Sequence, residues 1–255
     1  MKAFELFNQQ LIKEDLTKVD KDLLKKYNYN MNELKEKFNK YNLNIDNLYL
    51  NEKGPFSNFI YLGEYCSTEI YLDKDFLEDE RLGLPIILAR NENFKNMFLK
   101  EEYSLIFHPE FNNMALYYFL KHYKNINKDR LFEIFIVCYQ SISFGFKYIS
   151  EEVLEYIFKY KPTTKEVLDK MIDDDVIHHN TTTDDYLTIY RGQGSKSLDI
   201  RKAKSWSLSY EVANRFAVFS NGELLEGKVK VSDIIDYIPG GEEEVLVNYK
   251  DIHFK

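Results

Sequence analysis

Cysteine is scarce in this chain, and its scarcity excludes two classes of stabilised fold. Two cysteines, Cys66 and Cys138, occur among 255 residues, in dissimilar sequence surroundings. They supply neither a disulfide framework nor the paired spacing of a zinc site, and such usage is typical of a reducing compartment. We therefore expect a cytoplasmic protein without a metal. The abundance of Tyr, Phe, Lys and Asn is typical of AT-rich coding and favours a bacterial or phage origin, with the infected host cell as the second possible setting.

Long hydrophobic runs are also missing. The most apolar segment, Leu131–Phe146, contains Glu133 and Gln140 and is shorter than the roughly 20 residues that a membrane-spanning helix needs. Residues 1–14 have the spacing of a polar amphipathic helix and lack the apolar centre of a signal peptide. We expect no membrane partner and no secretion through a signal peptide.

The chain has no excess of positive charge. It carries 34 Lys and Arg against 42 Asp and Glu, a net charge of −8, so the whole surface would repel nucleic acid and anionic membranes. A local basic patch stays possible. The hydrophobic content of 44% is that of an ordinary globular protein and excludes wholesale disorder.

Helical spacing dominates the first 172 residues, with one mixed stretch between residues 48 and 109. Helix-like patterns occupy residues 2–45, 114–121, 129–139, 150–160 and 163–171. Strand-like runs in the mixed stretch are residues 59–62, 69–72 and 85–88. We expect an N-terminal mixed, mainly helical region over residues 1–110 and a C-terminal domain over residues 111–255, with helices in 111–172 and a sheet in 186–250. Helices followed by a sheet give an α+β fold.

Three of the histidines are candidate metal ligands, but their positions in the sequence favour other roles. His122 lies among aromatic residues on a predicted helix, where a core histidine is the simplest interpretation. His178 and His179 lie in an Asp- and Thr-rich stretch, residues 173–185. Adjacent histidines point in different directions on most backbones, so we interpret this stretch as a loop.

The last seventy residues change to strand-like patterns. Residues 187–191 alternate and end at Gly192, which predicts a strand with Leu187, Ile189 and Arg191 on one face. An arginine beside glycines suits a phosphate, because its planar fork bonds two oxygens and glycine lets a ligand approach the backbone. A surface ion pair is the alternative explanation.

Two further patterns follow in order. Ser205-Trp206-Ser207 predicts a short strand with both serines on one face, and Ser209 caps a helix whose buried stripe we expect to be Val212, Phe216 and Phe219. Glu242-Glu243-Glu244 then enters the apolar strand Val245–Val247. If the extended backbone reaches back far enough, Glu242 and Glu244 share a face. Adjacent carboxylates raise one another's pKa, so their position beside a buried strand favours a function over a solvated loop.

Together these residues resemble the arginine-serine-glutamate class of mono-ADP-ribosyltransferases, which includes clostridial binary-toxin enzymes and phage transferases. The resemblance covers residues 186–250. It rests on Tyr190-Arg191-Gly192, on Ser205-Trp206-Ser207 with Ala213 and Phe216 after it, and on Glu242-Glu243-Glu244. It implies a split β-sheet domain that uses NAD as a substrate and needs no metal.

The resemblance also implies a role for each residue. Arg191, with Tyr190 beside it, would bind an NAD phosphate, the Gly192 backbone would recognise the nicotinamide carboxamide, and Ser207 would line the cofactor site. Ser205 would contact the cofactor and orient Glu244.

The three glutamates are assigned by their register. Glu244 would be the catalytic carboxylate, because it directly precedes Val245, and Glu242 would polarise the acceptor, expected to be a protein arginine. The triple glutamate leaves this register open by one residue.

Two alternatives remain at this point. The acceptor could be a nucleic acid, since Lys196, Arg201, Lys202 and Lys204 form a small basic patch between the first two motifs. The chain could also be a non-catalytic interaction protein with a degenerate NAD fold.

Overall fold

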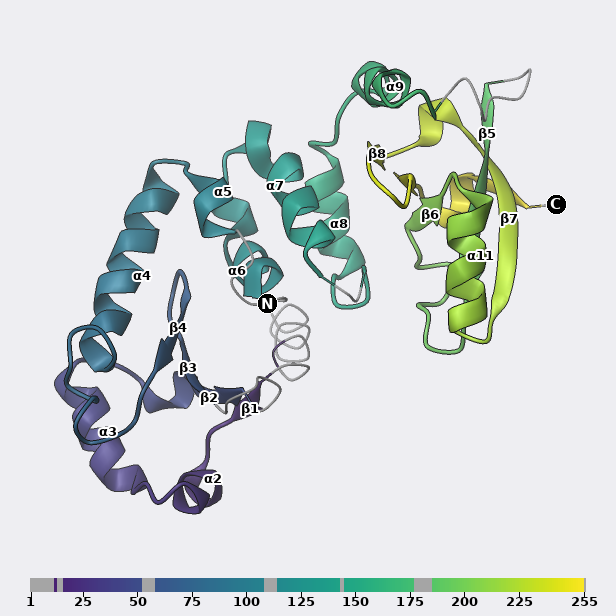
Figure 1. Cartoon of the computed structure of the whole chain (residues 1–255). Coiled ribbons are helices and arrows are strands. Elements are labelled where there is room, and N and C mark those ends of the chain that lie inside the picture. Colours follow the sequence, from purple (N-terminus) through teal and green to yellow (C-terminus); the bar gives the residue numbers. More distant parts are fainter. Residues whose placement is uncertain are drawn as a thin grey trace. The chain divides into compact units, whose positions relative to one another are not determined.

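The chain folds into two compact units, residues 1–143 and 144–255, both shown in the computed structural model of Figure 1. The structure describes residue 12 and residues 16–51, 58–107, 114–142, 145–176 and 185–254. Both units combine helices with an antiparallel sheet, so the fold is α+β. The division lies after residue 143 and not after residue 110, because the helices of residues 114–140 belong to the first unit.

The first unit is built on a four-stranded antiparallel sheet in the order β1-β2-β3-β4. Its elements are β1 (Thr17–Lys18), α2 (Lys21–Lys26), α3 (Met31–Lys40), η1 (Ile45–Asn47), β2 (Leu48–Asn51), β3 (Asn58–Leu62), β4 (Ser67–Ile70), α4 (Leu84–Leu99), α5 (Tyr103–Ile106), α6 (Met114–His122), η2 (Tyr123–Asn125) and α7 (Lys128–Gln140). Leu24 of α2 and Phe38 of α3 are completely buried in one cluster with Leu48 and Leu50 of β2. The helices α2 and α3 therefore supply part of the core that the sheet needs.

Two of the three strand-like runs in this unit are strands, and the third is wrong. Residues 59–62 lie in β3, and residues 69–70 end β4. Residues 85–88 belong instead to helix α4, which Gly83 precedes and which has Pro85 in its first turn. Proline is favoured there because the first helical N–H groups have no partner within the helix. A short apolar run fits a strand or a helix, and here the helix buries Ile87 and leaves Leu88 44% exposed.

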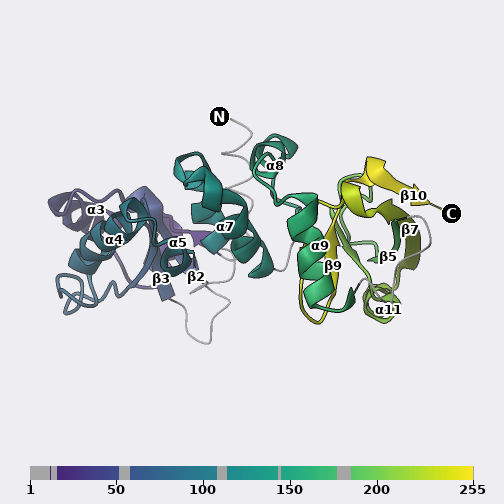
Figure 2. The ribbon, with the colours of Figure 1, turned by 90° about the horizontal axis from the view of Figure 1, so that it is seen from above.

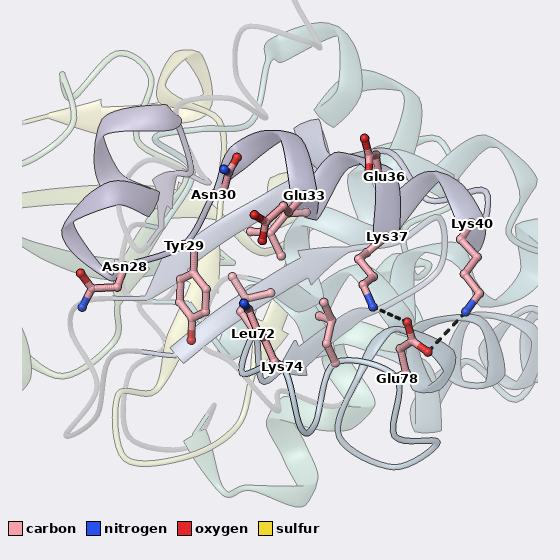
Figure 3. A pocket seen from close by; sticks show the side chains of 12 residues that line it. Asn28, Tyr29, Asn30, Glu33, Glu36, Lys37, Lys40, Leu72, Lys74 and Glu78 are labelled. Atoms are coloured by element: carbon pink, nitrogen blue, oxygen red, sulfur yellow. Dashed lines mark hydrogen bonds and ion pairs between the residues drawn. The ribbon is translucent and has the colours of Figure 1, made fainter.

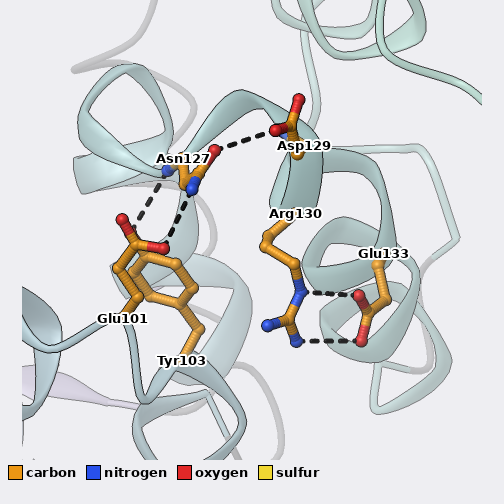
Figure 4. Close-up of polar contacts among 6 residues, drawn as sticks. All are labelled: Glu101, Tyr103, Asn127, Asp129, Arg130 and Glu133. Carbon is orange, nitrogen blue, oxygen red and sulfur yellow. Dashed lines mark hydrogen bonds and ion pairs between the residues drawn. The ribbon is translucent and has the colours of Figure 1, made fainter.

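Helix α7 begins at a network of side-chain hydrogen bonds (Figure 4). The Asn127 carboxamide oxygen accepts the backbone N–H of Asp129 at 3.1 Å, which caps the helix. The backbone N–H of Asn127 donates to the Tyr103 hydroxyl at 3.2 Å, and its side-chain amide donates to Glu101 at 2.9 Å. These bonds connect the start of α5 to the start of α7. They explain this polar cluster as structural.

The second unit contains a six-stranded antiparallel sheet in the order β10-β7-β5-β6-β9-β8. Its elements are α8 (Glu151–Phe158), α9 (Thr164–Asp173), β5 (Tyr186–Gln193), β6 (Ser205–Ser207), α11 (Tyr210–Phe219), β7 (Glu223–Lys230), η3 (Val231–Asp233), β8 (Asp236–Ile238), β9 (Glu244–Leu246), η4 (Tyr249–Asp251) and β10 (Ile252–Phe254). Helix α9 packs against β8 (Figure 1) and α11 packs against β5 (Figure 2).

One face of this sheet forms the core of the unit. Leu187, Ile189 and Val229 are completely buried, and Trp206 and Val245 pack in the same cluster. This face agrees with the alternation expected for β5 and β6. Thr163 caps α9 through a reciprocal bond with Glu166.

Helix α11 packs against β5 through small residues. Ser209 caps it, and Val212, Ala213 and Ala217 are buried. The expectation that Phe216 and Phe219 lie in the buried stripe is wrong, because they are 51% and 87% exposed. The helix axis comes so close to β5 that only small side chains fit between them.

Some expectations concern residues outside the described ranges. The amphipathic helix over residues 1–14 lies almost wholly there, as do His178 and His179. His122, by contrast, is 6% exposed, stacks on Tyr65 at 4.8 Å and bonds the Glu64 carbonyl, which is the core role expected for it. Within the described ranges no helix is long and apolar enough to cross a membrane.

Candidate active site

The sheet brings the three sequence patterns onto neighbouring strands. Strand β6 lies between β5 and β9, so Ser205–Ser207 is flanked by the strand of Arg191 and the strand of Glu244. Tyr190 is paired with Ser207, and Ser207 is paired with Glu244. Paired residues on antiparallel strands project from the same face. Tyr190, Ser207 and Glu244 therefore form one row across the sheet.

The two serines hold different positions relative to Glu244. Ser207 lies directly opposite it, whereas Ser205 lies opposite Leu246. Ser205 is thus the diagonal neighbour of Glu244, about 7–8 Å away between α carbons and within reach of a long side chain. The residue that the sequence assigned to orient Glu244 is Ser205, but the register makes Ser207 its nearer neighbour.

Ser207 also holds the turn that carries the acids. Its hydroxyl donates to the backbone carbonyl of Glu242 at 2.7 Å and accepts the N–H of Ser209 at 3.0 Å. Only 8% of Ser207 is exposed. Because one side chain joins β6, the start of α11 and the acid turn, Ser207 fixes the position of the residues before β9.

The acid turn is not an extension of the strand. Strand β9 begins at Glu244, and Glu243 has a left-handed backbone with φ of 44°. Its N–H bonds the carbonyl of Gly240 at 3.0 Å. The expected shared face of Glu242 and Glu244 fails, because alternation stops at Glu243. Glu242 lies exposed in the turn.

A left-handed backbone at a residue with a side chain costs roughly 1–2 kcal/mol. Glu243 has this backbone at φ of 44°. It separates Glu242 from Glu244, so that the two carboxylates next to the strand occupy different environments.

Glu244 is the buried carboxylate of the three. It is 9% exposed and lies in the row between Ser207 and Ile238, while Val245 and Leu246 after it are completely buried. Moving a carboxylate out of water is costly unless partners compensate. A carboxylate kept at such a depth, beside hydroxyl groups and at the mouth of a strand, is a candidate for catalysis.

Arg191 lies where β5 and β6 separate. Tyr190 and Ser207 are the one registered pair between these strands, which places Arg191 opposite Trp206 just beyond it. Its guanidinium donates to the backbone carbonyl of Ser205 at 2.6 Å. Two interstrand spacings separate Arg191 from β9, so its α carbon is about 10 Å from that strand. By alternation the Arg191 side chain leaves β5 on the same face as Ile189. Its guanidinium lies between β5 and β6.

Gln193 is a site residue that the sequence analysis missed. Its carboxamide oxygen accepts a bond from Arg191 Nε at 3.0 Å, and its nitrogen donates to the Leu198 carbonyl at 2.9 Å. It thereby positions the guanidinium. The spacing in the sequence could have identified Gln193, since a residue two positions after Arg191 lies on the same face of the strand.

Gly192 is required by packing. A Cβ built on it would lie 2.4 Å from the Ala217 nitrogen, 2.5 Å from the Ala213 carbonyl oxygen and 2.8 Å from Phe216 Cβ. The helix α11 therefore occupies the space that a side chain would need. The absence of a side chain at Gly192 has a structural cause that does not involve a ligand.

Aromatic rings border the row of Tyr190, Ser207 and Glu244. The Tyr190 ring meets the Tyr210 ring edge-on at 5.6 Å between centroids. Tyr210 is the first residue of α11 and is 49% exposed. It was not singled out from the sequence. The pair gives this face of the sheet a partly exposed apolar edge.

A second buried acid lies at the sheet edge. Asp236 of β8 is 1% exposed and bonds Lys170 of α9 at 2.8 Å. Burial raises the pKa of the Asp236 carboxyl, and the Lys170 ammonium opposes that shift only in part. The neighbouring Tyr237 hydroxyl donates to Asp174 at 3.0 Å. Both contacts attach α9 to β8, so Asp236 has a structural explanation.

The first unit has an open hollow of about 690 Å³ between α3 and the loop before α4 (Figure 3). Lys37 and Lys40 point toward Glu78 across it and form ion pairs. These bonds lower the pKa of the Glu78 carboxyl. All three side chains are more than 40% exposed, and such pairs contribute little to stability. The hollow has mixed charges and no buried polar group that points to a ligand.

Comparison with protein-family models, with curated proteins and with solved structures finds no match. In the parts of the chain that the structure describes, no three His, Cys, Asp or Glu side chains come together as a metal site.

Proposed function

We propose that the second unit is an NAD-dependent mono-ADP-ribosyltransferase of the arginine-serine-glutamate type. The observation that carries the proposal is the adjacency of β5, β6 and β9, with the buried Glu244 next to Ser207 and with Arg191 bonded to the carbonyl of Ser205. The sheet order brings the three strands side by side, with the Arg191 α carbon about 10 Å from the strand of Glu244. The resemblance in sequence and this arrangement support the same function.

The roles follow from the chemistry of each group. The Arg191 guanidinium suits an NAD phosphate, because its donors match phosphate oxygens. The Glu244 carboxylate would accept a hydrogen bond from a ribose hydroxyl and stabilise the positive charge that develops on the ribose as nicotinamide leaves. Ser205 would orient Glu244, and Ser207, whose hydroxyl donates to the Glu242 carbonyl, would fix the turn before it. No metal is needed, since the leaving nicotinamide departs as a neutral molecule.

The acceptor would approach from the acid turn. Glu242 is exposed and precedes the buried Glu244 by two residues. A carboxylate there suits a cationic acceptor, and the resemblance favours a protein arginine. Nucleic acid is a second candidate acceptor, favoured by cationic side chains near the start of β6.

Release of nicotinamide tests the proposal. The full-length chain is incubated with NAD labelled in the nicotinamide, and free label is measured over time. We expect Glu244→Gln to lower the rate by about 100-fold or more, because a preorganised electrostatic contact is lost. Glu243→Gln is the matched control, and it should keep the rate within about threefold. No release by the unchanged protein, or equal rates for both variants, would leave the non-catalytic interaction protein as the better interpretation.

Transfer is measured separately, with a small guanidino compound as the acceptor. Glu242→Ala should lose transfer while it keeps nicotinamide release. Loss of both to the same extent would contradict the acceptor role of Glu242.

A further inference from the structure

An open groove of about 800 Å³ lies in the second unit, at the ends of β6 and β9. One wall is a face of α8 that runs from its first residue to its last, and the other is formed by Arg201, Lys202 and Lys204 and by the segment from Asn248 into η4. Five cations line it against two carboxylates, Glu151 and Glu155. This is the opposite of the whole chain, whose net charge is −8.

The cations come from three separate segments. Lys159 follows α8, Arg201 and Lys202 precede β6, and Lys250 lies in η4. All four are exposed. The sequence alone placed a basic patch at residues 196–204, but the fold adds Lys159 and Lys250 and leaves Lys196 outside the groove. A mixed-sign helix surface would not gather cations from distant segments in this way.

The fifth cation holds the groove together. Lys204 is 7% exposed, bonds Asn248 at 3.2 Å and pairs with Glu151 at 3.3 Å. It therefore joins the segment after β9 to the beginning of α8 and neutralises one of the two carboxylates. Four exposed cations then remain beside Glu155, and one of them, Arg201, also pairs at the surface with Asp199 at 3.5 Å.

Two aromatic side chains also line the groove. Phe158 and Tyr249 are half-buried and belong to opposite walls. A cationic groove with aromatic rings is the arrangement that binds single-stranded nucleic acid, because the cations contact the phosphates and the rings stack on bases. The Tyr249 ring also packs against Phe254 at 5.3 Å between centroids, which holds it in the groove wall.

We propose that this groove binds single-stranded nucleic acid. The groove is close to the candidate active site, because the Val247 N–H bonds the Lys204 carbonyl at 2.8 Å and so continues the pairing of β6 with β9. Asn248 lies four residues after Glu244, about 14 Å along an extended chain. Binding itself does not depend on the proposed NAD chemistry. Where both hold, the bound strand is the acceptor nearest to Glu244.

Fluorescence anisotropy with a labelled 12-nucleotide RNA, and with DNA of the same sequence, tests the proposal on the full-length chain at 50 to 300 mM KCl. Each phosphate contact with a single strand contributes about −0.7 to the slope of log K against log salt concentration, so four cations predict a slope of about −2.8. Lys202→Gln with Lys250→Gln should reduce the steepness by about 1.4 and weaken binding at 0.1 M salt about 25-fold. Lys196→Gln with Lys228→Gln is the control pair, and it should leave both values unchanged.

Three results would overturn the proposal. These are no binding at 50 mM KCl, equal losses from the two variant pairs, or equal binding of polyglutamate, polyphosphate or duplex. Stacking predicts at least about fivefold tighter binding of the single strand than of polyphosphate. Glu244→Gln should bind normally, which separates a failure of the groove from a failure of the transferase. The RNA and the DNA share the phosphates and bases that the groove would contact. Tight binding of either one supports the proposal, and the comparison shows which of the two the groove prefers.

Discussion

Gly192 offers the sharpest test of how helix α11 is seated on the sheet. In Gly192→Ala the new Cβ would lie 2.4 Å from the Ala217 nitrogen and 2.5 Å from the Ala213 oxygen, where ordinary contacts begin at 3.4 Å. Both atoms are helix backbone, so α11 must retreat by about 1 Å. Added volume that forces backbone shifts costs about 1–3 kcal/mol, and we expect about 3 kcal/mol here because no side chain can turn aside.

The assay is urea unfolding followed by tryptophan fluorescence. Trp206 is the single tryptophan of the chain and is buried in the core of the second unit, so its emission reports on that unit. With a slope of about 1.5 kcal/mol per molar urea, a loss of 3 kcal/mol lowers the midpoint by about 2 M. Gly241→Ala is the matched control, since nothing lies within 4 Å of its Cβ. It should be unchanged or up to about 1 kcal/mol more stable.

A midpoint for Gly192→Ala within about 0.3 M urea of the unchanged protein, which is about 0.5 kcal/mol, would refute the close packing of α11 on β5. A large loss in both glycine variants would also refute it. In that case the cost would come from the substitution of any glycine in this region and not from contact with the helix.

Three further predictions concern other contacts. Ser209→Ala removes the side-chain bond to the Val212 N–H and should cost about 1 kcal/mol in the same urea assay; an unchanged midpoint would show that water replaces the cap. Lys170→Met leaves the buried Asp236 carboxylate without its partner at 2.8 Å, and we expect the free energy of unfolding to fall by about 1–2 kcal/mol, a small loss because Lys170 is 44% exposed. Asp236→Asn should lower the free energy of unfolding less than Lys170→Met does. A larger loss from Asp236→Asn would contradict the burial of an unpaired carboxylate as the cause. Burial lowers the pKa of His122, so its contribution to stability is complete above its ordinary pKa near 6.5 and is lost as the pH falls through the lowered value; His122→Gln should flatten that part of the pH dependence of thermal unfolding measured by circular dichroism.

The local elements near the candidate site could be predicted from the sequence. Alternation identified β5 and β6, and the apolar run identified β9, because each strand has one face in the core. Ser209 as the cap of α11 was predictable, since its hydroxyl satisfies an N–H of the first turn. These features depend on residues close together in the chain.

The arrangement between elements could not be predicted in the same way. Ser207 is opposite Glu244 because of strand register, which no local pattern specifies. Phe216 looked buried from its apolar character, but Gly192 draws α11 so close that Ala213 and Ala217 fill the interface. The prediction that Glu242 shares a face with Glu244 is wrong. Three identical glutamates give no sign that the middle one, Glu243, has a left-handed backbone.

The join between β5 and β6 has a consequence for motion. Eight residue pairs connect β5 to β7, whereas one pair, Tyr190 with Ser207, connects β5 to β6. Local opening requires less free energy where few backbone bonds must break. Amide protons of β6 should therefore exchange with deuterium sooner than those of β5 and β7, and the Arg191 bond to the Ser205 carbonyl at 2.6 Å is one further restraint between the strands. The two groups of strands, β10-β7-β5 and β6-β9-β8, are therefore held together mainly by the shared core of Leu187, Ile189, Trp206 and Val245, and Arg191 and Glu244 lie in different groups.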